Sequence, residues 1–367
     1  MPPLTRRLFR MLSLHIDGFL LACATILILV GLAVLYSAAD QNAAKVVSQI
    51  INITIACIVM WTIANIPPHQ LLRFALPLYV AGLLLLIGVA LFGEISNGAR
   101  RWLNIGITRI QPSELMKIAV PLMLAWYFDR HEAMLSLKNY AFAALFLLVP
   151  VLLIARQPDL GTAILIASSG FFVILLAGLD WKILLGLFVS GLASLPVLWS
   201  VLHDYQKQRL LTLIDPSQDP LGAGYHTIQS MIAVGSGGIA GKGWLHGTQA
   251  HLDFLPEHTT DFIFAVFSEE FGLIGNFFLL IMYSLVIGRG ISIAAEAPTL
   301  FSRLMAGSIT LTFFTYCFVN MGMVSGILPV VGVPLPLISY GGTSMVTMLL
   351  GFGILMSIHT HKKLVKT

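Results

Sequence analysis

Long, unbroken hydrophobic runs separated by short polar stretches form the main pattern of the sequence. Ten of these runs can each form a helix that spans a bilayer, which takes about 20 residues. They cover residues 17–39, 43–65, 71–93, 113–129, 139–155, 160–178, 181–203, 271–295, 302–328 and 343–361. A membrane β-barrel would instead show short segments of alternating polarity, so the pattern predicts a helical membrane protein.

The composition leads to the same fold class. Of the 367 residues, 57% are hydrophobic and 10% are charged, against about a quarter charged in soluble domains. A soluble enzyme, a secreted domain and a disordered chain are thereby excluded. We predict an all-α, polytopic integral membrane protein with about ten transmembrane helices, forming a single domain over residues 1–367. The three cysteines lie inside apolar runs, which favours buried thiols over a disulfide framework.

The positive charges predict the orientation of the chain. Arg6, Arg7 and Arg10 precede the first run, which is too long for the core of a signal peptide, so we expect an uncleaved first helix. Ten spans leave both termini on one side. With the termini inside, 12 of the 21 Lys and Arg residues lie inside and 8 outside, and Lys117 lies within a span. This bias predicts that both termini are cytoplasmic.

Two segments then lie on the outer face, residues 94–111 and 203–270. The second is too long for a simple connector between helices 7 and 8 and carries 8 of the 17 acidic residues. Its glycine-rich run from Gly235 to Gly243 departs from the phosphate-loop pattern at two positions, and we expect it to be a flexible lining around a bulky ligand. The pattern places candidate chemistry on the outer face.

Three ionisable residues are the main candidates for chemistry. Glu114 and Lys117 are three positions apart on the fourth span, so they share one helical face. Such a pair at membrane depth indicates either a functional site or an ion pair that fixes helix packing. Asp261 lies where the long outer segment turns apolar. It is a candidate general base with a raised pKa or, alternatively, a helix N-cap.

Further polar residues on the outer face suggest ligand contacts. Arg100, Arg101 and Arg109 suit a diphosphate, whereas Trp102 beside them is also typical of an ordinary interface anchor. A second group matches no standard zinc spacing, and we predict no metal site there. It comprises His246, His251, Asp253, Glu257 and His258.

The C-terminal region carries the most specific motif, NMGMVSGILPVVGVPLPLISYGGTS, from Asn320 to Ser344. It strongly resembles the signature of the SEDS family of shape, elongation, division and sporulation proteins. The resemblance covers the whole chain. Residues 111–117, 156–162 and 255–264 are most similar to the elongation members of that family.

The resemblance implies a peptidoglycan glycosyltransferase that polymerises lipid II on the outer face of the membrane during cell elongation. It further implies an inverting mechanism, a growing glycan on undecaprenyl diphosphate as donor, and a partner from the class B penicillin-binding proteins within the elongation machinery. Asp261 matches the essential aspartate of the family, and Glu114, Lys117 and Trp102 match positions important for activity. No nucleic acid is expected.

We therefore predict Asp261, Glu114 and Lys117 as the catalytic set. The predicted substrate-binding set contains Arg101, Trp102, Arg109, Gln111, Lys242 and Ser339. A positive charge near the leaving diphosphate would come from Arg101, Arg109 or Lys117. No cofactor is evident, and assistance by a divalent cation (Mg²⁺ or Mn²⁺) is left open.

Two other functions compete with this interpretation, a lipid II flippase and a non-catalytic scaffold for a penicillin-binding protein. A flippase needs polar groups along a path through the midplane, but here the unusual groups cluster at the outer end. A scaffold gives no reason for a Glu–Lys pair beside an outer Asp. The placement of charge therefore favours the polymerase.

Overall fold

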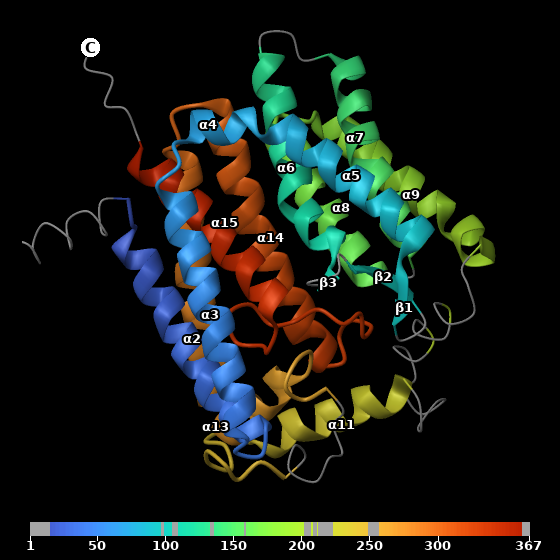
Figure 1. The fold of residues 1–367 in the computed structure, drawn as a ribbon. Helices are drawn as coiled ribbons and strands as arrows, with labels where there is room; N and C mark the ends of the chain where they lie inside the picture. Colours follow the sequence, from blue (N-terminus) through green and yellow to red (C-terminus); the bar gives the residue numbers. More distant parts are fainter. Residues whose placement is uncertain are drawn as a thin grey trace, which may run out of the picture.

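The chain folds as a bundle of long helices that run alternately up and down (Figure 1). The computed structural model describes residues 15–96, 99–104, 109–132, 136–157, 159–201, 207, 211, 223–248 and 257–361. Each of the ten predicted spans corresponds to one long helix. These are α2 (Gly18–Ala38), α3 (Ala43–Ala64), α5 (Ala75–Phe92), α6 (Pro112–Arg130), α7 (Leu137–Ala155), α8 (Leu160–Leu176), α9 (Trp181–Val201), α13 (Ile263–Ala295), α14 (Leu300–Val324) and α15 (Gly342–Thr360).

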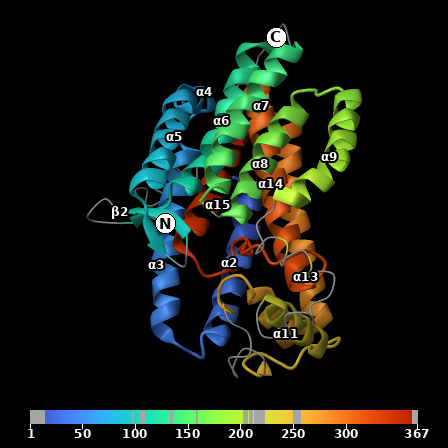
Figure 2. The same cartoon turned by 90° about the vertical axis from the view of Figure 1, so that its right-hand side faces the viewer.

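The surface of the bundle is that of a multi-pass membrane protein. Seven of these helices are long and apolar enough to cross a membrane; α8 and most of α9 are shorter apolar helices. Large apolar side chains such as Leu84 and Phe92 are exposed around the bundle, where lipid can cover them. Figure 2 shows α9 at the edge of the bundle. The predicted fold class is confirmed.

The bundle has two distinct ends. At one end, called here the termini end, α2 begins and α15 finishes, and the short helix α4 (Pro68–Arg73) leads into α5 (Figures 1 and 2). At the other, called here the loop end, lie the described residues of the 94–111 segment, α11 (Ala223–Ser236), the turn before α13 and the loop before α15. The start of α2 and the end of α15 therefore lie at the same end of the bundle, as an even number of spans requires.

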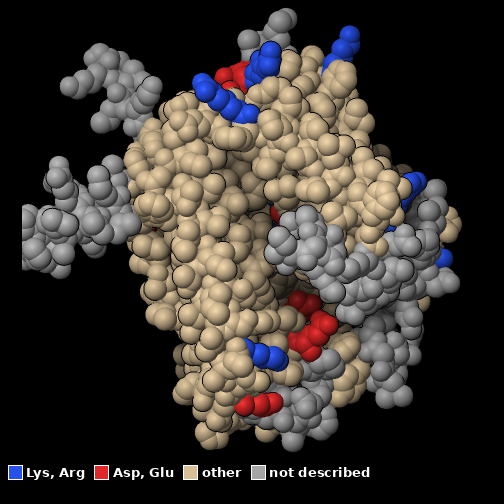
Figure 3. All heavy atoms as spheres, in the orientation of Figure 1, with Lys and Arg blue, Asp and Glu red and all other residues tan. Residues whose placement is uncertain are grey.

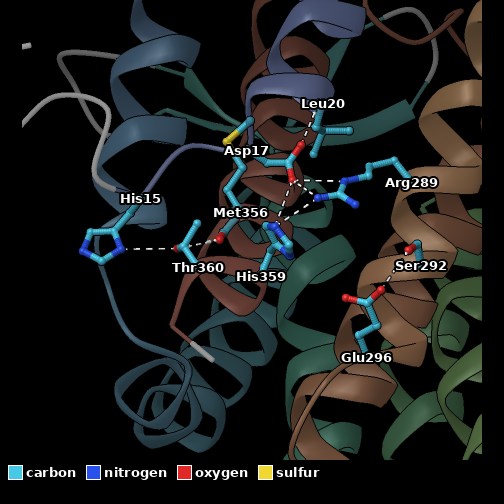
Figure 4. A network of polar contacts seen from close by, with 9 residues as sticks. All are labelled: His15, Asp17, Leu20, Arg289, Ser292, Glu296, Met356, His359 and Thr360. Atoms are coloured by element: carbon cyan, nitrogen blue, oxygen red, sulfur yellow. Dashed lines mark hydrogen bonds and ion pairs between the residues drawn. The ribbon is translucent and has the colours of Figure 1, made fainter. Parts of the chain in front are cut away.

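At the termini end, polar side chains from three helices contact one another and so link these helices (Figure 4). Asp17 is the N-cap of α2 and accepts the amide of Leu20 at 2.8 Å. Its other carboxylate oxygen accepts two hydrogen bonds from Arg289 of α13, at 2.5 and 3.1 Å, and lies 3.4 Å from Nε2 of His359 on α15. A capping carboxylate thus also links the first, eighth and tenth long helices.

A small sheet at the loop end was not predicted. Strands β1 (Glu94–Ser96), β2 (Ala99–Asn104) and β3 (Arg109–Ile110) form a three-stranded antiparallel sheet between α5 and α6. Glu94 faces Trp102, and Asn104 faces Arg109. Strands of two to six residues are too short for polar alternation to reveal them. The sheet directs the chain that enters α6 at Gln111.

The eighth long helix begins eight residues before its predicted start, at Ile263 instead of residue 271. It breaks at Gly272, which has φ 62° and ψ −158°. The glycine-rich run fills the break: the amides of Lys242 and Gly243 donate to the carbonyls of Glu269 and Glu270. These glycines thus allow a close approach of two backbones, where the sequence predicted a flexible lining.

Candidate active site

Asp261 lies in a tight turn that leads directly into α13. Glu257 at the start of this turn has a left-handed backbone, with φ 55°. The loop between α14 and α15 packs on the turn: the amide of Tyr340 donates to the carbonyl of Thr259 at 3.0 Å, and Oγ of Ser339 donates to the carbonyl of Thr260 at 2.7 Å. Two segments far apart in the sequence, the end of the 203–270 segment and the signature motif, thus form one unit.

The surroundings of Asp261 oppose its ionisation. Burial raises the pKa of its carboxyl group, and the charge and hydrogen bonding of Glu257 raise it further, to about 7. A carboxyl group with a pKa near neutrality can accept a proton from a substrate hydroxyl and release it again. Gly332 of the signature motif lies so close that a Cβ there would be 3.3 Å from Oδ2 of Asp261.

Glu114 and Lys117 form a close ion pair near the start of α6. Nζ of Lys117 donates to Oε1 of Glu114 at 2.6 Å, and both side chains are largely buried. Thr347 of α15 donates to the other Glu114 oxygen at 3.1 Å, and the ammonium lies 5.4 Å from the centre of the Tyr316 ring. The pair thus bridges α6, α14 and α15, as well as carrying charge.

An elongated apolar groove runs from this pair along the bundle, between α3, α5, α6 and α15. It encloses about 760 Å³. Gln111 and Glu114 lie at its polar end, and Leu71 and Phe74 belong to the opposite end of the bundle. Figure 3 shows this face of the molecule hollowed, with acidic atoms within the hollow. A long hydrocarbon chain fits such a groove, with its polar head beside Glu114.

Asp159 connects two of the predicted substrate-binding residues. It is the N-cap of α8, and its other carboxylate oxygen lies 3.5 Å from Nε2 of Gln111 and 3.8 Å from Nε of Arg101. The sequence analysis did not assign Asp159, although its place directly before an apolar run is a recognisable N-cap signal. The carboxylate anchors the region where β2 meets α6.

The remaining predicted residues have different surroundings. Lys242 forms a 2.6 Å ion pair with Glu269 of α13. Trp102 lies half-buried on β2. The side chain of Arg109, together with the whole of His251 and Asp253, lies outside the described residues. Roles for all of these residues toward substrate stay predictions.

Comparison with known proteins decides the family. The family model FTSW_RODA_SPOVE, described as "Cell cycle protein", matches residues 13–364. The chain belongs to this family. It is 52% identical to the peptidoglycan glycosyltransferase MrdB of Escherichia coli (strain K12), over 96% of this chain and 95% of that protein. It is 31% identical to the peptidoglycan glycosyltransferase RodA of Treponema pallidum, over 94% and 98%.

Solved structures of family members have the same fold. One is described as "Structural coordination of polymerization and crosslinking by a peptidoglycan synthase complex"; it has a TM-score of 0.83, 31% identity, and covers 95% of this chain and 99% of its own. The rod shape determining protein RodA of Thermus thermophilus has a TM-score of 0.71 and 29% identity, over 94% and 96%. The SEDS resemblance seen in the signature motif is confirmed.

Proposed function

We propose that this chain is a peptidoglycan glycosyltransferase that polymerises lipid II, with Asp261 as general base. The observation that carries the proposal is the combination at the loop end: a carboxyl group with a pKa of about 7, held in a rigid turn, in the same bundle as an apolar groove with a charged head. The names of relatives that share 52% and 31% of their residues with this chain support the same activity.

In the proposed reaction, the ionised carboxylate of Asp261 takes the proton from the 4-hydroxyl of the incoming GlcNAc. The oxygen attacks the anomeric carbon of the growing glycan, and the bond from that carbon to undecaprenyl diphosphate breaks with inversion. The bond formed is a β-1,4 link. The raised pKa lets Asp261 hold the proton near neutral pH and then lose it to water.

The leaving diphosphate needs positive charge and hydrogen-bond donors. Lys117 supplies an ammonium one helical turn from the polar end of the groove, where it neutralises Glu114; its side chain lines a neighbouring cavity beside Tyr316. Arg101 adds a partly exposed guanidinium. We assign the groove to an undecaprenyl chain, because its lining is mostly apolar and extends from Gln111 at the loop end to Leu71 of α4 at the termini end.

We further propose that the loop end faces outward from the inner membrane and that both termini are cytoplasmic. This follows from the Lys and Arg bias. We also propose a class B penicillin-binding protein as partner, which agrees with the similarity to a peptidoglycan synthase complex.

Purified protein with labelled lipid II, alone and with the partner, tests the proposal by the polymer seen on a gel. Asp261→Asn keeps the shape and removes the base, so polymerisation should fall about 10²–10⁴-fold while lipid II binding is kept. Lys117→Met should also abolish most polymer. The control is Asp180→Asn, an exposed carboxylate at the termini end, which should be fully active.

The outcomes separate the candidate functions. A flippase or a scaffold gives no polymer even from the wild type. A fully active Asp261→Asn enzyme would remove the aspartate from the mechanism and leave Glu257 or Glu114 as the next candidate base.

A further inference from the structure

Three successive carbonyl groups in the turn before α13 each accept a hydrogen bond from the C-terminal part of the chain. The carbonyls of Thr259 and Thr260 are bonded by Tyr340 and Ser339, as described above. The third belongs to Asp261 itself and accepts from Nδ2 of Asn320 at 2.8 Å. Its donor is a buried side chain in the last two turns of α14.

Asn320 donates both hydrogens of its side-chain amide nitrogen. It is completely buried, and the second hydrogen on Nδ2 is donated to the carbonyl of Val333 at 2.7 Å. Its own Oδ1 is buried and has no hydrogen-bond partner among the described residues. A buried polar residue with an unsatisfied oxygen is costly, so its value lies in the two donated bonds. They join the backbone of Asp261 to the loop segment that packs on it.

We propose that Asn320 is a positioning residue for Asp261, holding the aspartate backbone against the segment around Val333 so that its carboxyl group meets the acceptor hydroxyl. This inference rests on the proposed function, in which Asp261 is the base. It assigns Asn320 no contact with substrate.

The surroundings of Asp261 show why the two hydrogen bonds donated by Asn320 matter. Asp261 lies just before α13, and the left-handed Glu257 shows that the turn is tightly wound. Ser339 is itself fixed, because its Oγ accepts the amide of Leu335 at 2.7 Å while it donates to Thr260. Without Asn320, the carbonyls of Asp261 and Val333 both lose their donor, and water must enter to satisfy them. A displacement of about 1 Å at a reacting group can cost about 10²-fold in rate.

Asn320→Leu is the main test, since it keeps the volume and removes both donors together with the unsatisfied oxygen. Asn320→Asp keeps the shape and loses the donors, but it also brings a carboxyl group that can ionise next to Asp261. The matched control is Thr315→Val on the same helix, because among the described residues the Thr315 hydroxyl bonds only to the carbonyl of Leu311 in that helix. Each full-length variant is purified, and its polymerisation of labelled lipid II is measured against lipid II concentration and pH.

For both Asn320 variants we expect kcat to fall about 10–100-fold with KM nearly unchanged. In Asn320→Leu, entry of water relieves the burial of Asp261, so the acid limb of the pH profile should move to lower pH. In Asn320→Asp the added carboxylate opposes the ionisation of Asp261, so the acid limb should move to higher pH. Among the described residues, the charged group that acts on Asp261 is Glu257 of the same turn, and His226 of α11 stacks on the neighbouring Phe262. Asn320, Gly332 and Val333, from α14 and the following loop, do not titrate. Thr315→Val should match the wild type in both measurements.

Hydrogen exchange of the peptide covering residues 257–264 gives a second measurement that needs no catalysis. Its amides should exchange faster in both Asn320 variants, while peptides from α7 are unchanged. Wild-type kcat and wild-type exchange in Asn320→Leu would overturn the inference, as would a lower kcat with an unshifted pH profile. If Asp261→Asn is inactive while Asn320→Leu is fully active, this inference alone fails; if Asp261→Asn is fully active, the proposed base fails with it.

Discussion

At the scale of single residues, the proposed chemistry depends on one carboxyl group whose surroundings oppose its charge. Asp261 combines burial with a neighbouring carboxylate, and both effects raise its pKa. The same group in water would be ionised above about pH 4 and would be a weak base. The raised pKa therefore comes from the partial burial of this carboxyl group beside Glu257, in the turn that Ser339 and Asn320 contact.

This environment predicts a pH dependence of polymerisation. The base must be ionised to act, so the rate should rise with pH through about 7 and fall below it. Because burial and Glu257 both contribute, Glu257→Gln should shift the acid limb to lower pH. Rates of lipid II polymerisation between pH 5 and 9 for the two enzymes measure this.

The linkage between pKa and stability supplies a control for that experiment. A carboxyl group with a raised pKa in the fold contributes stability while it is protonated, and that contribution is lost as pH rises through the folded-state pKa of about 7. Asp261→Asn should therefore unfold at a temperature no lower than that of the wild type at pH 8. A strongly lowered unfolding temperature would mean that the Asn variant is inactive for structural reasons.

Sequence patterns identified several residues of the candidate site, but they did not predict most of the contacts that these residues make. The spacing of Glu114 and Lys117 predicted their ion pair, and the structure contains it at 2.6 Å. Ser339 was predicted to bind substrate, but its hydroxyl makes two bonds within the protein. Asn320 was not assigned, because its partners lie 59 and 13 positions away and no local pattern reveals such contacts.

At the scale of elements, the central feature is the break in α13. Between the two halves of this helix, Leu273 and Ile274 donate to the carbonyls of Gly238 and Ile239, while Lys242 and Gly243 donate to the carbonyls before the break. The glycine-rich run thus supplies the bonds that a continuous helix would have made. It also fixes the first half of α13, which begins two residues after Asp261.

The two backbones lie so close together at this break that specific positions require glycine. Gly241 has φ 79°, and a Cβ there would lie 2.1 Å from the carbonyl oxygen of Glu270. Gly241→Ala should lower the free energy of unfolding by at least about 1–3 kcal/mol, the usual cost of a left-handed non-glycine residue. Thermal unfolding in detergent measures it.

A neighbouring glycine serves as the matched control. Gly235 lies in α11 with open space around its Cβ position. Gly235→Ala should be neutral or stabilise the protein by about 0.5–1 kcal/mol, as expected within a helix. Equal effects of the two alanine substitutions would contradict the role of the break.

Element boundaries show where sequence patterns stop being informative. Hydrophobic runs predicted all ten long helices, because each must cover the same membrane thickness. The three strands before α6 were missed, and so was the helical start of α13 before Gly272. The strands pair with residues only 3–8 positions away but are too short for a period-two pattern to reveal them. The break in α13 depends on backbone pairing with residues 238–243, of which a local hydrophobic pattern carries no record.

At the scale of the whole molecule, the two ends of the bundle have different compositions. The termini end contains Arg73, Arg130 and the Asp17–Arg289 link, and Figure 3 shows basic side chains at its surface. The loop end contains the groove head, the turn with Asp261 and the buried Glu269 and Glu270. Lipid-linked substrates that reach the enzyme from the outer leaflet require the loop end to face outward.

This orientation predicts which positions a membrane-impermeant maleimide can reach. In a background where Cys23, Cys57 and Cys317 are replaced, His246→Cys at the loop end should react in intact spheroplasts. Gln70→Cys on α4, at the termini end, should react only after lysis. Both positions are exposed, so accessibility differs only through the membrane. The reverse pattern would place the candidate base on the cytoplasmic side of the membrane. Polymerisation on the outer face would then be impossible, and the proposed function would be contradicted.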